Sequence, residues 1–138
     1  MVTETERQKT EVERFGVPDF IGEWENHYRT EYFGLYILRR EPAMGRVDRF
    51  IPNYRTIKIG EMFEGMIIDD VGIAVASGII TPEMVNFEKR YSHFVVIHKG
   101  GISRLVYEGQ YDKDTGMYVG TYVVPGTKIS ATFWMKTP

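Results

Sequence analysis

The chain has 138 residues, a formal net charge of −2 at pH 7 and no cysteine. This length is typical of a single domain with one sizeable hydrophobic core. The lack of cysteine excludes a disulfide framework and thiolate chemistry, which fits a reducing compartment and favours the cytoplasm. No apolar run approaches the roughly 18 residues needed to cross a bilayer, and the N-terminus lacks the apolar core of a secretory signal, so we expect no membrane partner.

The first predicted element is a short helix. Thr3 and Glu6 have the spacing of a capping box, and Gly16 followed by Pro18 provides a stop signal. This helix would either close one end of the following domain or fray. The sequence therefore predicts an N-terminal helical segment over residues 1–19 and a β-barrel domain over residues 20–138.

The pattern changes to strands from Phe20 onward, where β-branched and aromatic residues recur. After a first strand that starts near Phe20, the expected strands cover residues 32–40, 62–68, 72–80, 84–91, 93–99, 102–111, 117–124 and 128–136. Turn signals between them are too short for helical crossovers and join antiparallel neighbours. An open sheet of this size would leave two unpaired edges, so the sequence predicts an all-β, single antiparallel up-and-down barrel of about eight strands.

One pattern occurs twice, as FEGMIIDDVGIAVASG over residues 63–78 and as YEGQYDKDTGMYVG over residues 107–120. Each copy reads as a hairpin in which an acidic turn closes with glycine. Glycine within a strand weakens it, so Gly65 and Gly109 predict sharp bending or a neighbouring aromatic ring across the gap.

The stretch FIGEWENHY, with Gly22 and Trp24, resembles the Gly-x-Trp opening of the calycin barrels, which include lipocalins, fatty-acid-binding proteins and avidins. The later FEG…DD.G…F.K.Y and YEG.YD..TG patterns are similar to small lipocalin-like domains, and the resemblance covers roughly residues 20–136. It departs from lipocalins in lacking their C-terminal helix and their Thr-Asp-Tyr motif. GEWEN also resembles the avidin Gly-x-Trp-x-Asn, which implies ligand contact at Asn26, but the other biotin contacts are not recognisable and biotin is not predicted.

Few residues point to reaction chemistry. His27, His93 and His98 lack metal-ligand spacing, so no metal site is predicted; a single histidine holding haem, as in some barrels of related shape, is the alternative to a structural role. DKDTG at residues 112–116 lacks the later glutamate of a calcium loop. No nucleophile elbow or phosphate-binding glycine loop occurs, and no cofactor is expected.

Aromatic side chains are abundant, with nine tyrosines, eight phenylalanines and two tryptophans. An eight-stranded barrel is about the size at which one small ligand fits inside. The tyrosines predicted to line such a pocket, with core packing as the alternative, are Tyr36, Tyr91, Tyr107 and Tyr122. Together with Trp24 and Asn26 they form the candidate binding site.

Residues 39–58 hold six basic and two acidic side chains, whereas residues 1–38 hold four basic and eight acidic ones. Such a segment either attracts an anionic group or is a solvated loop. Arg39 is predicted to meet an acidic ligand group at the barrel mouth, with Arg40 pointing outward. Nucleic acid is not expected, because it requires a broader basic face.

These patterns predict a barrel that binds a small apolar or aromatic molecule in its interior, with an acidic group as an option. Two alternatives are an isomerase or cyclase and a packed barrel that acts as a homodimeric interaction module. An open interior would favour ligand binding or catalysis, whereas a filled interior would favour the interaction module.

Overall fold

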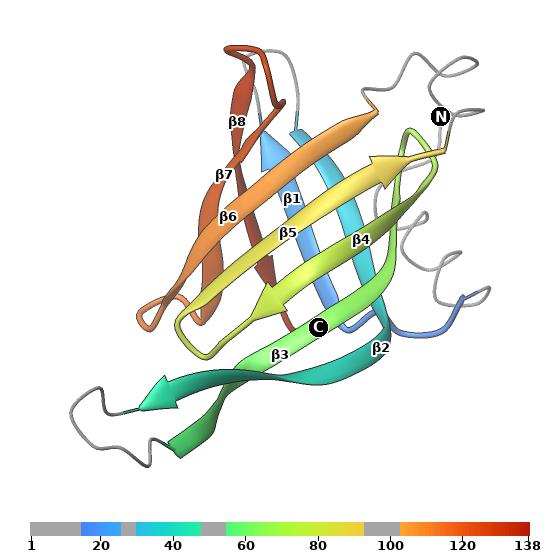
Figure 1. The fold of residues 1–138 in the computed structure, drawn as a ribbon. Helices are drawn as coiled ribbons and strands as arrows, with labels where there is room; N and C mark the ends of the chain where they lie inside the picture. Colours follow the sequence, from blue (N-terminus) through green and yellow to red (C-terminus); the bar gives the residue numbers. More distant parts are fainter. Residues whose placement is uncertain (1–14, 26–29, 48–54, 93–102) are drawn as a thin grey trace.

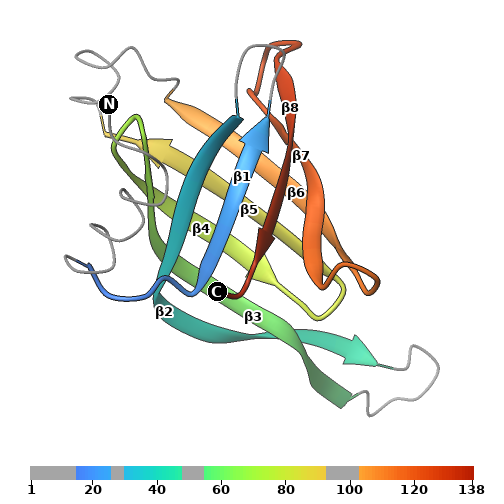
Figure 2. The same ribbon diagram turned by 180° about the vertical axis from the view of Figure 1, so that it is seen from behind.

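The computed structural model describes residues 15–25, 30–47, 55–92 and 103–138, which form a closed antiparallel β-barrel (Figure 1 and Figure 2). Its strands follow one another around the barrel in chain order, and β1 pairs with β8 to close it. They are β1 (Phe20–Glu25), β2 (Thr30–Val47), β3 (Arg55–Asp69), β4 (Ile73–Ile80), β5 (Met84–Tyr91), β6 (Arg104–Asp112), β7 (Met117–Val123) and β8 (Ser130–Lys136). The predicted all-β barrel is confirmed, while most of the predicted N-terminal helix and the predicted strand at residues 93–99 lie outside the described residues.

The up-and-down order places the ends of the strands alternately at two ends of the barrel. We call the end with the β3–β4 turn the upper end and the end with the β4–β5 turn the lower end, as they are drawn in Figure 1. The chain enters β1 and leaves β8 at the lower end, and β2 runs into β3 beyond that same end.

Both copies of the repeated pattern form hairpins, β3–β4 and β6–β7, as predicted. The two turns lie at opposite ends of the barrel, and Gly65 pairs with Ala76 whereas Gly109 pairs with Gly120. A Cβ atom on Gly109 would lie 3.0 Å from the Phe133 ring, as expected for a covering aromatic. A Cβ on Gly65 would instead lie 2.2 Å from a backbone carbonyl oxygen of β2, so the crowding group there is backbone and not a ring.

The barrel interior is filled by aromatic side chains. The Phe87 ring stacks on the Tyr107 ring with centroids 4.7 Å apart, and Phe133 meets Tyr107 edge-on at 5.0 Å. A cavity of ligand size would expose the side chains that line it, yet the central residues Phe33, Phe87 and Tyr107 are each 1% exposed. The described residues therefore show a filled interior and not an open one.

Strands β2 and β3 extend well past the lower end of the barrel. Strand β4 pairs only with residues 61–68 of β3, so residues 55–60 pair with β2 alone. Together with residues 43–47 of β2 they form a two-stranded ribbon that projects from the barrel (Figure 1 and Figure 2). One extra residue in each strand shifts the register, Leu38 in β2 and Ile59 in β3.

Candidate functional site

A cluster of polar groups lies inside the upper half of the barrel. Lys89 Nζ donates hydrogen bonds to Asp69 Oδ2 at 3.1 Å and to the Tyr91 hydroxyl at 2.9 Å, and that hydroxyl donates to the same Asp69 oxygen. The side chains of Lys89 and Asp69 are both 2% exposed. Because an isolated charge is costly to bury, the mutual pairing is what allows both ions to remain in the interior.

The local sequence explains how this cluster forms. Lys89 and Tyr91 are two residues apart on β5, so their side chains lie on the same face of the strand. Both are buried, so this face is the one that points into the barrel. Asp69 ends β3, and its second oxygen accepts hydrogen bonds from the backbone N–H groups of Val71 at 2.9 Å and Gly72 at 3.1 Å. The Asp69 carboxylate therefore bonds both the backbone of the β3–β4 turn and the Lys89 and Tyr91 side chains of β5.

Burial raises the pKa of Tyr91; the Lys89 ammonium opposes this effect, and the Asp69 carboxylate reinforces it. Burial also raises the pKa of Tyr107 well above its ordinary value. Both hydroxyls therefore stay protonated at neutral pH, which leaves the Tyr91 hydroxyl as a donor to Asp69.

Four of the predicted site residues gather around this cluster. The Lys89 ammonium lies 4.7 Å from the Tyr91 ring centroid and 5.4 Å from that of Tyr107. The Tyr122 ring is 5.3 Å from the Tyr107 ring and 5.8 Å from the Trp24 ring. The sequence analysis predicted these four side chains to line a ligand pocket; the structure packs them in the filled interior, and ligand contact by them stays a prediction.

Two charged members of the cluster, Asp69 and Lys89, were not predicted, and neither was Glu31, which is buried and pairs with Trp24 across β1 and β2. The available signal was Lys89 in F.K.Y, a lysine at the inward-facing position of a strand between two aromatic residues. Side chains alternate between the two faces of a strand, so Lys89 lies on the same face as Phe87 and Tyr91, inside the barrel.

The other predicted site residues lie elsewhere. Tyr36 follows the inward-facing Leu35 and therefore points outward, where its hydroxyl donates to the Gly16 carbonyl oxygen at 3.1 Å and its ring contacts Phe15. The interior position expected for Tyr36 is wrong because adjacent strand residues face opposite sides. Asn26 lies outside the described residues.

The orientation predicted for Arg39 and Arg40 is reversed by the extra residue Leu38. After this bulge Arg39 pairs with Glu64 on the outer face, while Arg40 pairs with the inward-facing Phe63. Arg40 then bonds Glu61 at 2.9 Å and Asp19 at 3.3 Å near the lower end. Arg39 does not reach the barrel interior.

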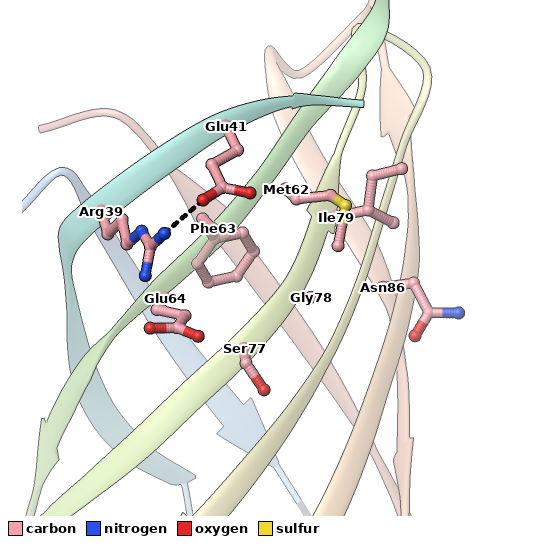
Figure 3. A pocket seen from close by; sticks show the side chains of 9 residues that line it. All are labelled: Arg39, Glu41, Met62, Phe63, Glu64, Ser77, Gly78, Ile79 and Asn86. Carbon is pink, nitrogen blue, oxygen red and sulfur yellow. Dashed lines mark hydrogen bonds and ion pairs between the residues drawn. The ribbon is translucent and has the colours of Figure 1, made fainter. Parts of the chain in front are cut away.

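Arg39 instead lines a groove of about 630 Å³ on the outer face (Figure 3). Arg39 Nη2 lies 2.5 Å from Glu41 Oε1 at one side of this groove, and Met62 and Ile79 supply apolar wall. Met62 pairs with Glu41 on one side and with Ile79 on the other, so these side chains share the face opposite to Phe63. The groove is therefore separate from the interior cluster.

Large apolar side chains are exposed on the outer surface of β3 and β4, and one of them, Met62, also lines the groove. They range from 43% to 64% exposure and lie on β3 and β4; they are Ile57, Ile59, Met62, Ile73 and Val75, and we call them the outer apolar face. Glu64 and Ser77, which pair across β3 and β4, lie between Met62 and the Ile73–Val75 end of this face. Exposed apolar side chains bordered by polar ones are typical of interaction sites.

Compared with models of protein families, with curated proteins and with solved structures, the chain matches none of them. The closed eight-stranded antiparallel barrel is consistent with a calycin-like architecture, and a relationship to lipocalins stays a prediction. Within the described ranges, no three acidic or histidine side chains are grouped so as to hold a metal ion. No helix in this part of the chain is long and apolar enough to cross a membrane.

Proposed function

We propose that this barrel is a non-enzymatic binding module that engages another polypeptide through its outer apolar face. The filled interior supports this function, because it leaves a ligand no room beside Phe87 and Tyr107. The apolar surface available for binding lies outside, on β3 and β4.

The composition of the outer face also fits a protein partner. Its apolar residues are bordered by charged and polar side chains, among them Arg39, Glu41 and Glu64 around the groove. An apolar centre with a polar rim is the usual arrangement of protein interfaces. The groove would accept a side chain from the partner, which is how interface anchors are commonly held.

Photo-crosslinking tests this proposal. A benzophenone amino acid in place of Val75, which is 64% exposed, should trap a polypeptide when the protein is irradiated in the cells that naturally produce it. Ile129 is 51% exposed and lies outside the face, in the β7–β8 connection, so it is the matched control. An adduct yield at Val75 no higher than at Ile129 would reject the proposal.

A second candidate is favoured by one observation, the buried Lys89–Asp69–Tyr91 cluster. Buried charged groups beside aromatic walls are frequent in functional sites. Here a small aromatic acid would bind in the upper half of the barrel and replace Asp69 as the partner of Lys89. Because the interior is filled, the aromatic side chains of the upper half would have to move to admit this ligand.

Titration with small probes tests the second candidate. An aromatic acid should raise the melting temperature and bind at least tenfold more tightly than its neutral analogue, since a hydrogen bond to a charged group contributes about 1.5–3 kcal/mol. Arg39→Met should leave that difference unchanged, because Arg39 lies on the outer face. If none of the probes shifts the melting temperature, this candidate is rejected.

A further inference from the structure

The buried cluster of Lys89, Asp69 and Tyr91 has the arrangement needed to join two of its members covalently. We propose that the Lys89 amine and the Asp69 carboxyl group condense into a side-chain amide, an isopeptide bond between β5 and β3, and that the chain itself catalyses this step. The inference is independent of the proposed binding of a polypeptide. It competes with the aromatic-acid candidate, because the bond consumes the amine that such a ligand would need.

The two reacting groups are already in contact. Lys89 Nζ lies 3.1 Å from Asp69 Oδ2, an oxygen bonded to the carbon that the amine would attack. The closed barrel holds them together although β4 lies between their strands. Well-oriented groups within one molecule react with effective concentrations of about 10⁵–10⁸ M, so fixed contact replaces an external catalyst that would have to bring them together.

The interior favours the amide over two separate ions. The Lys89 and Asp69 side chains are both 2% exposed, and the ammonium lies against the rings of Tyr91 and Tyr107. Two buried ions carry a desolvation penalty that a neutral amide does not. The reaction also releases water, and a site this closed to solvent supplies little water for the reverse reaction.

The β3–β4 turn supplies donors for the charge that develops during the reaction. When the amine attacks Cγ of Asp69, negative charge gathers on Oδ1 in the tetrahedral intermediate. This oxygen already accepts the backbone N–H groups of Val71 at 2.9 Å and Gly72 at 3.1 Å. Paired backbone donors about 2.7–3.1 Å from the oxygen are the arrangement of an oxyanion hole.

The Tyr91 hydroxyl connects the amine to the oxygen that must leave. Lys89 Nζ donates to this hydroxyl at 2.9 Å, and the hydroxyl donates to Asp69 Oδ2. Burial raises the pKa of Tyr91, so its hydroxyl gives up one proton only as it takes up another. Tyr91 is therefore placed as a proton relay between the two reacting groups.

The atoms balance without a further reactant. An ammonium proton first moves from Lys89 to Asp69 Oδ2, which leaves a neutral amine and a carboxylic acid. The amine nitrogen then forms the bond to Cγ, and a second nitrogen proton passes through the Tyr91 hydroxyl to Oδ2. The bond between Cγ and Oδ2 breaks, Oδ2 leaves as water, and the third nitrogen proton stays on the amide.

Intact mass spectrometry of the folded full chain tests the bond. We expect a mass below that of the sequence by one water molecule, and a tryptic digest in which the peptide containing Asp69 is joined to an uncut Lys89. Lys89→Met should show no loss. The full sequence mass for the unmodified protein, unchanged on prolonged incubation, would overturn the inference. A loss of water that persists in Lys89→Met would also overturn it, because dehydration of an aspartate by its own backbone needs no lysine.

The rate of bond formation tests the relay. Tyr91→Phe keeps the ring but removes the hydroxyl, so it should form the bond at least tenfold more slowly, since a positioned proton-transfer group contributes about 10²–10⁴-fold. Tyr111→Phe is the matched control, because Tyr111 is 41% exposed and its ring contacts Tyr118 outside the cluster. The fraction of chains that have lost one water, measured at successive times after synthesis, gives both rates. Equal rates would reject Tyr91 as the relay, and neither experiment affects the photo-crosslinking test at Val75.

Discussion

Replacing Asp69 by alanine is expected to lower the free energy of unfolding by about 3–5 kcal/mol, because the variant leaves the Lys89 ammonium buried without its anion. Lys89 is 2% exposed, so water cannot readily replace the carboxylate. The β3–β4 turn would also lose the oxygen that accepts from Val71 and Gly72. Chemical denaturation of the two proteins measures this difference directly.

A double-mutant cycle separates pairing from the other roles of Asp69. Asp69→Ala combined with Lys89→Met should be less destabilised than the sum of the two single variants, because the double variant buries no unpaired charge. Glu61→Gln is the surface control: it also removes an acidic partner of a lysine, but in water, so its effect should be far smaller. Strict additivity in the cycle would contradict the coupling inferred for the interior pair.

Replacing Trp24 by alanine is expected to cost about 3–5 kcal/mol, the range for removing a large aromatic side chain from a core. Trp24 is 7% exposed, pairs with Phe133 of β8 and contacts the Tyr122 ring of β7. Because β1 closes the barrel by pairing with β8, a cavity at Trp24 would weaken the contact between these two strands.

Trp134 provides the control for this prediction, because it lies on the outer face of β8. Trp134→Ala should cost much less, and Trp134→Phe leaves Trp24 as the sole tryptophan. The fluorescence of Trp24 in that variant should be shifted to the blue relative to a water-exposed indole. An emission spectrum typical of exposed tryptophan would contradict the position of Trp24 in the barrel.

The sequence by itself determined the β-barrel and the two repeated hairpins. Strand propensity and turn chemistry act over a few residues, so they can be read locally. Short connections force neighbouring strands to be antiparallel, and the number of strands favours closure. The inward positions of Tyr91, Tyr107 and Tyr122 follow from the alternation of side chains along a strand, which is equally local.

Only the tertiary structure decided which groups meet and which face each arginine takes. Asp69 and Lys89 are 20 residues apart on non-adjacent strands, and the closure and register of the barrel bring them together. The bulge at Leu38 turns Arg39 outward, because a single extra residue reverses every later side chain and leaves no mark in the hydrophobic pattern. Whether the interior is open depends on how side chains from all eight strands pack together. The length of the projecting ribbon depends on where β4 stops pairing with β3. These are long-range properties that local periodicity does not encode.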